Sequence, residues 1–335
     1  MVTLRKIASI VKGKLIGAPG QLIHGVSDIR NGVPETITFL LNPKHTKLVE
    51  QTAASAVIVN DSTLLAGKNG IVVESPRLAM SKVLKIFESK DHQPIGIHPT
   101  AIVYESVKIG EKVCIGAMAM IGKNAQIGKG SIIHNSVTIG ENVVLGDNVE
   151  IHAQVAVFSN VKIGNNVIID MGTIVGSSGF GYETADGIHH KIPQIGSVVI
   201  ADNVEIGANC TIDRGTITDT VIGEGTKIDN LVQVAHNVKI GKGCLIAAQT
   251  GISGSVDIGD FCIFAGQVGV NNGIKIGARS IFIGQTGVTK SLLGGKIYSG
   301  MPVREVGETN QRDAAYLKIK SLEKRLKNIE EQFAK

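Results

Sequence analysis

The stretch that decides the fold is KIGEKVCIGAMAMIGKNAQIGKGSIIHNSVTIGENVVLGDNV, residues 108–149. In it, one aliphatic residue returns every six positions and Gly often follows directly, as in Ile109-Gly110 and Ile139-Gly140. A fixed period of this kind sets the architecture before local propensities are considered. Six residues fit neither a helix of 3.6 residues per turn nor the two-residue repeat of a lone strand. They fit a coil of short strands joined by turns, with one apolar side chain per hexapeptide facing a shared interior.

The period extends well beyond this stretch. Aliphatic residues keep six-residue spacing from Ile97 to Val175, and the pattern resumes at Ile200, compresses at Ile217 and Ile222, and runs on to Val288. Three hexapeptides per turn would give a coil of 18 residues, and coils would stack at the parallel-strand spacing of roughly 4.8 Å. The sequence therefore predicts a mainly β chain with a parallel β-helix over residues 96–300. The spacing alone does not reveal its hand.

Residues 1–95 lack the six-residue period and are expected to form a small α/β domain. Strand-like runs occur at 56–59 and 71–73, and a helix is expected from Pro76 to Phe87 with Ser75 as its N-cap. Its apolar side would consist of Leu78, Val83, Leu84 and Phe87. Residues 89–94 are the expected linker.

Two further segments depart from the repeat. Residues 176–196 form an inserted loop rich in Gly, in which Phe180 and Tyr182 either cover a site or shield the edge of a coil. Residues 308–335 are expected to be a C-terminal helix, because apolar residues follow the 4-3-4-3-4 spacing of a coiled-coil seam: Ala315, Ile319, Leu322, Leu326, Ile329 and Phe333. Parallel homo-oligomerisation would cover this seam, and the alternative is a helix that folds back on its own solenoid.

Composition agrees with a narrow solenoid and excludes several classes. Gly is abundant at 41 residues, aromatic residues make up only 4%, and Trp is absent. The net charge of +5 is mild and no basic run is interleaved with aromatics, so nucleic-acid binding is not expected. The four Cys show no metal spacing, and three of them are expected to fill the interior as reduced thiols: Cys210, Cys244 and Cys262. No signal peptide and no apolar run of about 18 residues is evident, which favours a soluble cytoplasmic protein.

His134 and His152 are three hexapeptides apart and would stack on successive coils. Stacked imidazoles could share a metal ion, as in a metal-dependent solenoid hydratase. No third ligand is fixed by the spacing, and a column of like residues is the simpler interpretation. No metal or other cofactor is expected.

His236 and Gly254 are also one coil apart. The coil would bring an imidazole beside a residue whose backbone N–H has no side chain over it. Acyl transfer needs this combination, because a base removes a proton from the attacking amine or hydroxyl and an N–H donor stabilises the oxyanion.

Four segments resemble those of one acyltransferase family. They are ITFLLNPKH (37–45), GFGYETADGIHHKIPQIG (179–196), VVIADNVEIGANCTIDRGTITDTVIG (198–223) and IDNLVQVAHNVKIG (228–241). Together with the hexapeptides they are similar to the UDP-3-O-acylglucosamine N-acyltransferases, the third enzymes of lipid A biosynthesis in Gram-negative bacteria. The resemblance implies a left-handed parallel β-helix, a homotrimer with active sites between subunits, and transfer of an (R)-3-hydroxyacyl chain from acyl carrier protein to the 2-amino group of the UDP-sugar.

The resemblance also implies roles for residues. His236 matches the general base, Gly254 the oxyanion donor, and Asp229 an acidic residue associated with the base, for which an orienting or charge-stabilising role is expected. The family's uracil-binding residues match Phe39 and Asn42, and Lys290 matches a basic residue that faces the carrier.

Two positions depart from the family pattern. His45 stands where the family often has Tyr, and imidazole stacks on uracil with less area than a phenol ring. Gly273 stands where members often carry a second His near the sugar. Three alternatives stay open: the related UDP-GlcNAc 3-O-acyltransferase, the metal-dependent hydratase, and a scaffold that binds nucleotide and carrier without catalysis.

Overall fold

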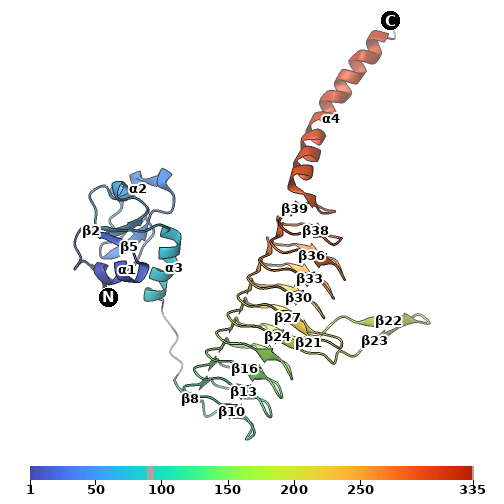
Figure 1. Cartoon of the computed structure of the whole chain (residues 1–335), viewed down its shortest axis with the longest axis horizontal. Helices are drawn as coiled ribbons and strands as arrows, with labels where there is room; N and C mark the ends of the chain where they lie inside the picture. The colour runs from blue at the N-terminus through green and yellow to red at the C-terminus, as the bar shows by residue number, and fades with distance from the viewer. Residues whose placement is uncertain (89–93, 334–335) are drawn as a thin grey trace. The chain divides into compact units, whose positions relative to one another are not determined.

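The computed structural model describes residues 1–88 and 94–333, and the chain divides into two compact units, Met1–His92 and Gln93–Lys335 (Figure 1). Most of the linker expected at 89–94 lies outside the described residues. Each unit has its own buried core. Among the described helices, none is both long and apolar enough to cross a membrane.

Unit 1 is a small α/β domain around a five-stranded sheet in the order β2-β7-β6-β5-β4. Its elements are β1 Val2–Thr3, α1 Leu4–Val11, β2 Lys14–Ile16, β3 Leu22–Ile23, β4 Gly25–Val26, β5 Thr36–Phe39, the 3₁₀ helix η1 Pro43–His45, α2 Lys47–Gln51, β6 Ala56–Val59, η2 Ser62–Leu65, β7 Gly70–Val72 and α3 Pro76–Phe87.

The helix expected after Ser75 is confirmed, and the Ser75 side chain accepts a hydrogen bond from the Leu78 N–H. The expected apolar face is wrong in part. Ala79 and Val83 are buried, whereas Leu78 and Leu84 are 58% and 44% exposed. α1 and α3 pack on each other, and the short Ala79 side chain lies within the buried core of the unit.

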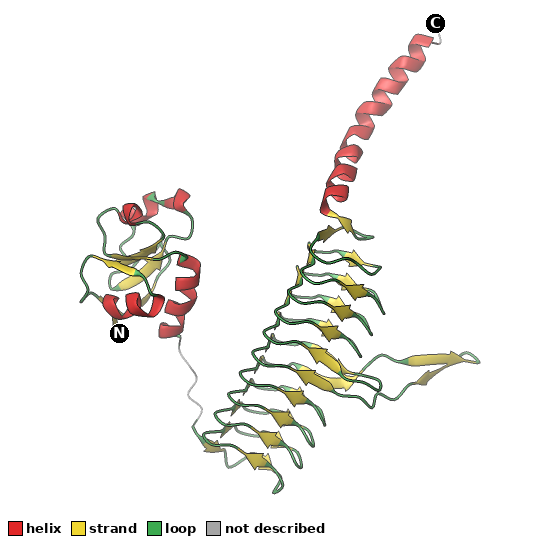
Figure 2. Ribbon diagram, in the orientation of Figure 1, coloured by secondary structure: helices red, strands yellow, loops and turns green. Residues whose placement is uncertain are grey.

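Unit 2 is a solenoid in which each coil contributes one short strand to each of three parallel sheets, here called faces 1, 2 and 3 (Figure 2). Face 1 contains β10 Lys108–Ile109, β13 Gln126–Ile127, β16 Val144–Leu145, β19 Lys162–Ile163, β24 Val198–Ile200, β27 Thr220–Ile222, β30 Lys239–Ile240, β33 Asp257–Ile258 and β36 Lys275–Ile276.

Face 2 contains β8 Gly96–Ile97, β11 Cys114–Ile115, β14 Ile132–Ile133, β17 Glu150–Ile151, β20 Ile168–Ile169, β25 Glu205–Ile206, β28 Lys227–Ile228, β31 Leu245–Ile246, β34 Ile263–Phe264, β37 Ile281–Phe282, β39 Ile297–Ser299 and the antiparallel β40 Arg304–Glu305. Face 3 contains β9 Ile102–Val103, β12 Met120–Ile121, β15 Thr138–Ile139, β18 Ala156–Val157, β21 Ile174–Ser178, β26 Thr211–Arg214, β29 Gln233–Val234, β32 Gly251–Ile252, β35 Gly269–Val270 and β38 Gly287–Val288.

The predicted register of three hexapeptides per coil holds in the regular coils. Gln126 pairs with Val144, and Gln233 pairs with Gly251. In the two-residue strands the second residue is the repeat apolar residue, and it is buried in nearly every coil. Ile217 is an exception to the predicted column, because it is 76% exposed in a loop that leaves the coil.

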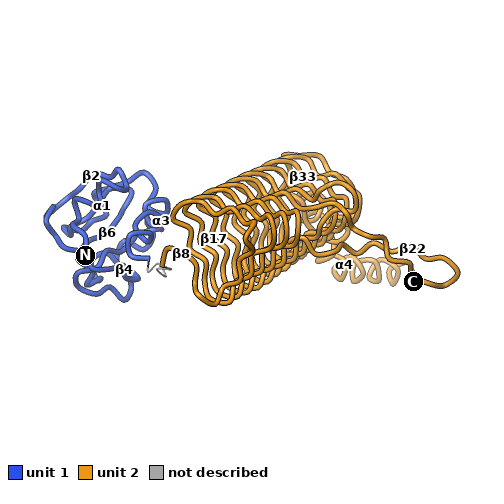
Figure 3. Tube along the Cα trace, turned by 90° about the horizontal axis from the view of Figure 1, so that it is seen from below, with its two compact units in different colours: residues 1–92 blue, residues 93–335 orange. Residues whose placement is uncertain are grey.

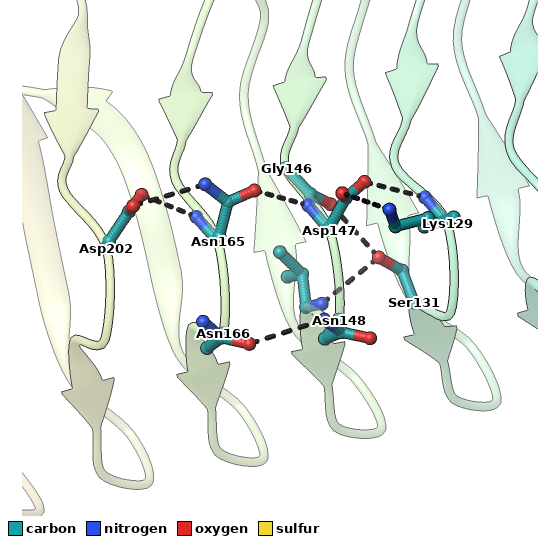
Figure 4. A network of polar contacts seen from close by, with 9 residues as sticks. Lys129, Ser131, Gly146, Asp147, Asn148, Asn165, Asn166 and Asp202 are labelled. Atoms are coloured by element: carbon teal, nitrogen blue, oxygen red, sulfur yellow. Dashed lines mark hydrogen bonds and ion pairs between the residues drawn. The ribbon is translucent and has the colours of Figure 1, made fainter.

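Close stacking explains why Gly follows the aliphatic residue so often. A Cβ atom on Gly128 would lie 2.3 Å from the Gly146 carbonyl carbon of the next coil. Figure 3 shows the coils stacked one behind another. Polar side chains join the coils at the corner between faces 1 and 2 (Figure 4). The Asp147 carboxylate accepts a hydrogen bond from the Lys129 N–H at 3.0 Å, and the Asn165 side-chain oxygen accepts one from the Asp147 N–H at 2.8 Å.

The prediction that three cysteines fill the interior is confirmed, since Cys210, Cys244 and Cys262 are all 0% exposed. The insertion starts later than residue 176, because β21 continues to Ser178 before an antiparallel hairpin forms from β22 Tyr182–Ala185 and β23 Ile188–Lys191. The C-terminal helix α4 Val306–Phe333 begins two residues earlier than expected. Its seam is exposed, with Leu322 at 53% and Leu326 at 58%, so the folded-back alternative is wrong.

Candidate functional site

A groove of about 1150 Å³ runs along face 3 beside the inserted hairpin. Its floor contains the outward residues of three successive strands, Gly251, Gly269 and Gly287, which pair directly with one another. Phe180 and Tyr182 from the insertion line the same groove, which fits the expectation that they cover a site. Because glycine leaves no side chain on the floor, the sheet itself bounds an open channel.

His236 lies at one wall of this groove, at the corner that follows β29. Its Nδ1 is 3.1 Å from Oδ1 of Asn237. That oxygen also accepts the Thr216 N–H, while the Asn237 amide nitrogen donates to the Thr218 carbonyl. These bonds identify the Asn237 oxygen as an acceptor, so the imidazole places its proton on Nδ1. In the neutral ring, Nε2 then carries a free lone pair.

Gly254 lies against the Nε2 side of the ring. A Cβ atom built on Gly254 would be 2.6 Å from Cε1 and 2.7 Å from Nε2 of His236. The next backbone N–H, that of Ser255, donates to the His236 carbonyl at 2.9 Å. Among the described residues, no acceptor takes a hydrogen bond from the Gly254 N–H. The juxtaposition expected from the coil length is therefore present.

Gly179 holds the ring from the other side. A Cβ atom on Gly179 would be 2.6 Å from the His236 Cβ and 2.9 Å from its Cδ2. The inserted segment thus comes close to the imidazole as well as to the groove. Together the two glycines leave just enough room for the ring of His236.

Asp213 is a groove residue that the spacing did not reveal. It is 7% exposed and accepts hydrogen bonds from the Ser177 hydroxyl at 2.8 Å and the Gln233 amide at 2.9 Å. Burial raises the pKa of its carboxyl above the ordinary value, and the Ser177 bond, nearby His236 and the Gln233 bond oppose the rise. Asp213 is the carboxylate on the groove wall that interacts with His236 in the same chain.

Asp229 lies elsewhere. It follows β28 on face 2, and its carboxylate accepts the backbone N–H groups of Asn230 and Ala248. It lines a separate hollow on face 2 and not the groove that contains His236. Asp229 therefore does not orient the imidazole of its own chain, because strand β29 of face 3 lies between the two residues.

The expected nucleotide residues gather in unit 1. Phe39, Asn42 and His45 line one cavity of about 410 Å³ together with Asp28 and Arg30. Phe39 ends β5 and is 8% exposed. Asn42 caps η1 by accepting the Lys44 N–H at 3.0 Å, and η1 ends at His45.

Two further positions belong to the rim. Lys290 is exposed and directly follows Thr289, which lines the groove. Gly273 has a φ of 69°, and a Cβ atom there would meet open space. Its neighbour Asn272 lines the groove near Gly254.

Comparisons with known proteins find relatives of both units of the chain. A family model described as UDP-3-O-(3-hydroxymyristoyl) glucosamine N-acyltransferase matches residues 21–86, and a bacterial transferase hexapeptide model matches 118–153 and 219–254. The chain is 50% identical over 99% of its length to the UDP-3-O-acylglucosamine N-acyltransferase of Methylacidiphilum infernorum, of which it covers 95%. It is 47% identical to that of Protochlamydia amoebophila, with 98% of the chain and 96% of the relative covered.

Solved structures show the same architecture. The Arabidopsis UDP-N-acetylglucosamine acyltransferase matches with a TM-score of 0.58 and 25% identity over 65% of this chain and 77% of that one. The Bacteroides fragilis UDP-N-acetylglucosamine acyltransferase matches with a TM-score of 0.51 and 26% identity over 63% and 73% of the two chains. The expected fold class, a left-handed parallel β-helix with a small α/β domain and a C-terminal helix, is confirmed.

Proposed function

Because the chain belongs to the UDP-3-O-acylglucosamine N-acyltransferase family, we propose that it transfers an (R)-3-hydroxyacyl chain from acyl carrier protein to the 2-amino group of its UDP-sugar, with His236 as general base. The observation that carries this proposal is the position of the His236 imidazole against Gly254 in the face 3 groove. No resident cofactor takes part in the proposed chemistry.

The proposed reaction is a direct attack without an acyl-enzyme. The sugar amine forms a C–N bond to the thioester carbon, and Nε2 of His236 accepts the proton that the amine releases. The Gly254 N–H donates to the oxyanion that develops on the former carbonyl oxygen. When the intermediate collapses, the C–S bond breaks and the imidazolium returns its proton to the thiolate. Asp213 favours the imidazolium during this interval through its nearby negative charge.

The glycine floor suits an alkyl chain. Gly251, Gly269 and Gly287 span three coils, and each buried CH₂ contributes roughly 0.8 kcal/mol to binding. At the far end, a Cβ atom on Gly287 would be 3.0 Å from Cγ of Met301. We expect the acyl chain to follow the glycines and to end at Met301, which then limits its length.

The cavity of unit 1 is proposed to hold the uridine. Phe39 would stack on the uracil ring, Asn42 would offer its amide, and His45 would form the second, smaller side of the clamp. Lys290, exposed beside the groove, is proposed to attract the acidic acyl carrier protein.

A homotrimer is proposed because the family resemblance implies one and because one face exposes aliphatic residues that a neighbouring copy would cover. Face 1 carries lysines such as Lys162 and Lys239, whereas face 2 carries exposed aliphatic residues such as Leu245 at 47% and Ile263 at 38%. Contact between face 2 of one copy and the vicinity of face 3 of the next would cover the aliphatic residues. It would also bring Asp229 of one copy toward the groove of another.

Mixing His236→Ala chains with Asp229→Ala chains, each of which we expect to be inactive alone, tests this arrangement. In trimers refolded from equal amounts of His236→Ala and Asp229→Ala chains, about a quarter of the sites would contain both native residues if each site draws on two copies. Activity should return to about that fraction. A mixture as inactive as its components would contradict a shared site.

The reaction class is tested with purified full-length chain and acyl carrier protein loaded with 3-hydroxyacyl groups of graded length. The expected product is an amide on UDP-3-O-acylglucosamine. Acylation of the 3-hydroxyl of UDP-GlcNAc would instead favour the related O-acyltransferase, and binding without any product would favour a scaffold. The four free cysteines fit a reducing compartment, and the proposed site of action is the cytoplasm.

A further inference from the structure

Two histidines and a carboxylate converge on face 2, away from the groove. The rings of His134 and His152 stack with centroids 4.7 Å apart and planes 11° from parallel. Oε1 of Glu150 is 3.1 Å from Nε2 of His134 and 3.7 Å from Nε2 of His152. One ligand atom from each of the three residues lies within 4.8 Å of the others. The cluster supplies the third ligand that the sequence spacing left open.

A second carboxylate lies beside them. Oδ1 of Asp170 is 3.6 Å from Nε2 of His152. Asp170 follows His152 by three hexapeptides, so His134, His152 and Asp170 form one column across three successive coils. Asp170 thus contacts His152, while the ligand atoms that all lie within 4.8 Å of one another are those of His134, Glu150 and His152.

In the described part of the chain, Glu150 has no charged neighbour in its own column of face 2. It is the outward residue of β17, and its direct neighbours on the adjoining strands are Ile132 and Ile168. Neither isoleucine can form a hydrogen bond or an ion pair with the Glu150 carboxylate. Its oxygen is directed instead at the imidazole nitrogens of the next column.

We propose that His134, Glu150 and His152 form a site for a divalent transition metal ion, Zn²⁺ by preference, with a water molecule as the fourth ligand. The distances of 3.1 and 3.7 Å from Oε1 of Glu150 to the two imidazole nitrogens are close to the separation of about 3.3 Å between ligands of a tetrahedral ion with bonds near 2.0 Å. Two imidazoles with a carboxylate favour Zn²⁺ or Co²⁺ over Mg²⁺ and Ca²⁺, which take oxygen ligands.

The ion would act as a clamp. Its ligands come from two consecutive coils, which are otherwise joined by short two-residue strands. None of these residues lines the groove of its own chain. An ion that binds only the folded coils stabilises them by mass action.

The test uses full-length chain stripped with a chelator and titrated with Zn²⁺ by calorimetry, and with Co²⁺ by visible absorption, which reports tetrahedral geometry. One ion per chain should bind, and Zn²⁺ should raise the thermal unfolding midpoint. Glu150→Gln and His152→Gln keep the size of each side chain, and each should weaken binding at least about tenfold, since even the loss of an outer-shell partner costs about 10–100-fold.

His98→Gln is the matched control. His98 lies in the same column two coils before His134, but it is exposed and bonds Thr100. This variant should bind Zn²⁺ like the native chain. The midpoint of each variant without metal checks that it folds. Absence of saturable binding, or equal binding by native chain and a Glu150→Gln/His152→Gln double variant, would overturn the proposal.

Discussion

Gly254 and His236 lie so close that a Cβ atom on residue 254 would be 2.6 Å from Cε1 and 2.7 Å from Nε2 of the imidazole. Real Cβ atoms essentially never approach other atoms so closely. Residue 254 must therefore be glycine for the ring to keep its place. The bare backbone of Gly254 and the basic nitrogen of His236 form one catalytic unit in the proposed mechanism.

Gly254→Ala should reduce kcat by about 100-fold or more, because the methyl group displaces the imidazole and covers the N–H donor. The measurement is steady-state transfer with separate kcat and KM values. Gly251→Ala is the control, since a Cβ atom there meets open space on the same groove. It should change KM while kcat stays within about threefold of the native value. Equal losses of kcat in both variants would contradict the role of Gly254.

Asn237→Ala should lower kcat by about 10–100-fold, because Nδ1–H of His236 loses its acceptor and the ring is no longer fixed. Asn209→Ala is the control, since Asn209 has the same left-handed backbone conformation but caps a different corner. Asn237→Asp restores an acceptor and should recover activity, with the acidic limb of the pH profile moved to higher pH. Failure of Asn237→Asp to differ from Asn237→Ala would count against a positioning role.

Asp213→Asn should change how stability depends on pH. Because burial raises the pKa of Asp213 in the folded state, the folded chain keeps this proton to higher pH than the unfolded chain. The free energy of unfolding therefore falls as pH rises from the ordinary carboxyl pKa through the raised one. Urea unfolding at fixed protein concentration should show this fall in the native chain and a smaller fall in the variant. An Asp257→Asn control, on exposed face 1, should behave like the native chain.

His45→Tyr should lower KM for the UDP-sugar by about 2–10-fold with kcat unchanged, because a phenol ring gives a larger stacking surface worth about 0.5–1.5 kcal/mol. Initial rates at varied UDP-sugar concentration give the two constants. His24→Gln, which lines a different hollow of unit 1, should leave both constants unchanged. A rise in KM for His45→Tyr would mean that residue 45 does not face the uracil.

Regular coils could be predicted from the sequence because each hexapeptide must place one apolar residue inside. His236 and Gly254 were brought together on that basis alone, since their coil keeps its three hexapeptides. The prediction that Ile217 lies inside was wrong, because the pattern cannot distinguish an interior aliphatic residue from one in a loop that leaves the coil.

Other parts of the site could not be predicted, because they depend on contacts that the six-residue period does not determine. Asp213 meets Ser177 across 36 residues, because the inserted hairpin changes the coil length. Asp229 is only seven residues from His236 in sequence, yet strand β29 separates the two side chains. Glu150 contacts His134 and His152 from a neighbouring column of residues. Whether a side chain contacts the next column depends on its length, which the six-residue period does not specify.

The central claim is that His236 accepts the proton in N-acyl transfer. The most direct measurement is the rate at which the His236→Ala chain acylates UDP-3-O-acylglucosamine from loaded acyl carrier protein, with oligomer size and UDP-sugar affinity measured on the same sample. The account predicts a loss of about 100-fold or more in kcat with size and affinity unchanged. Near-native turnover by this variant would contradict it.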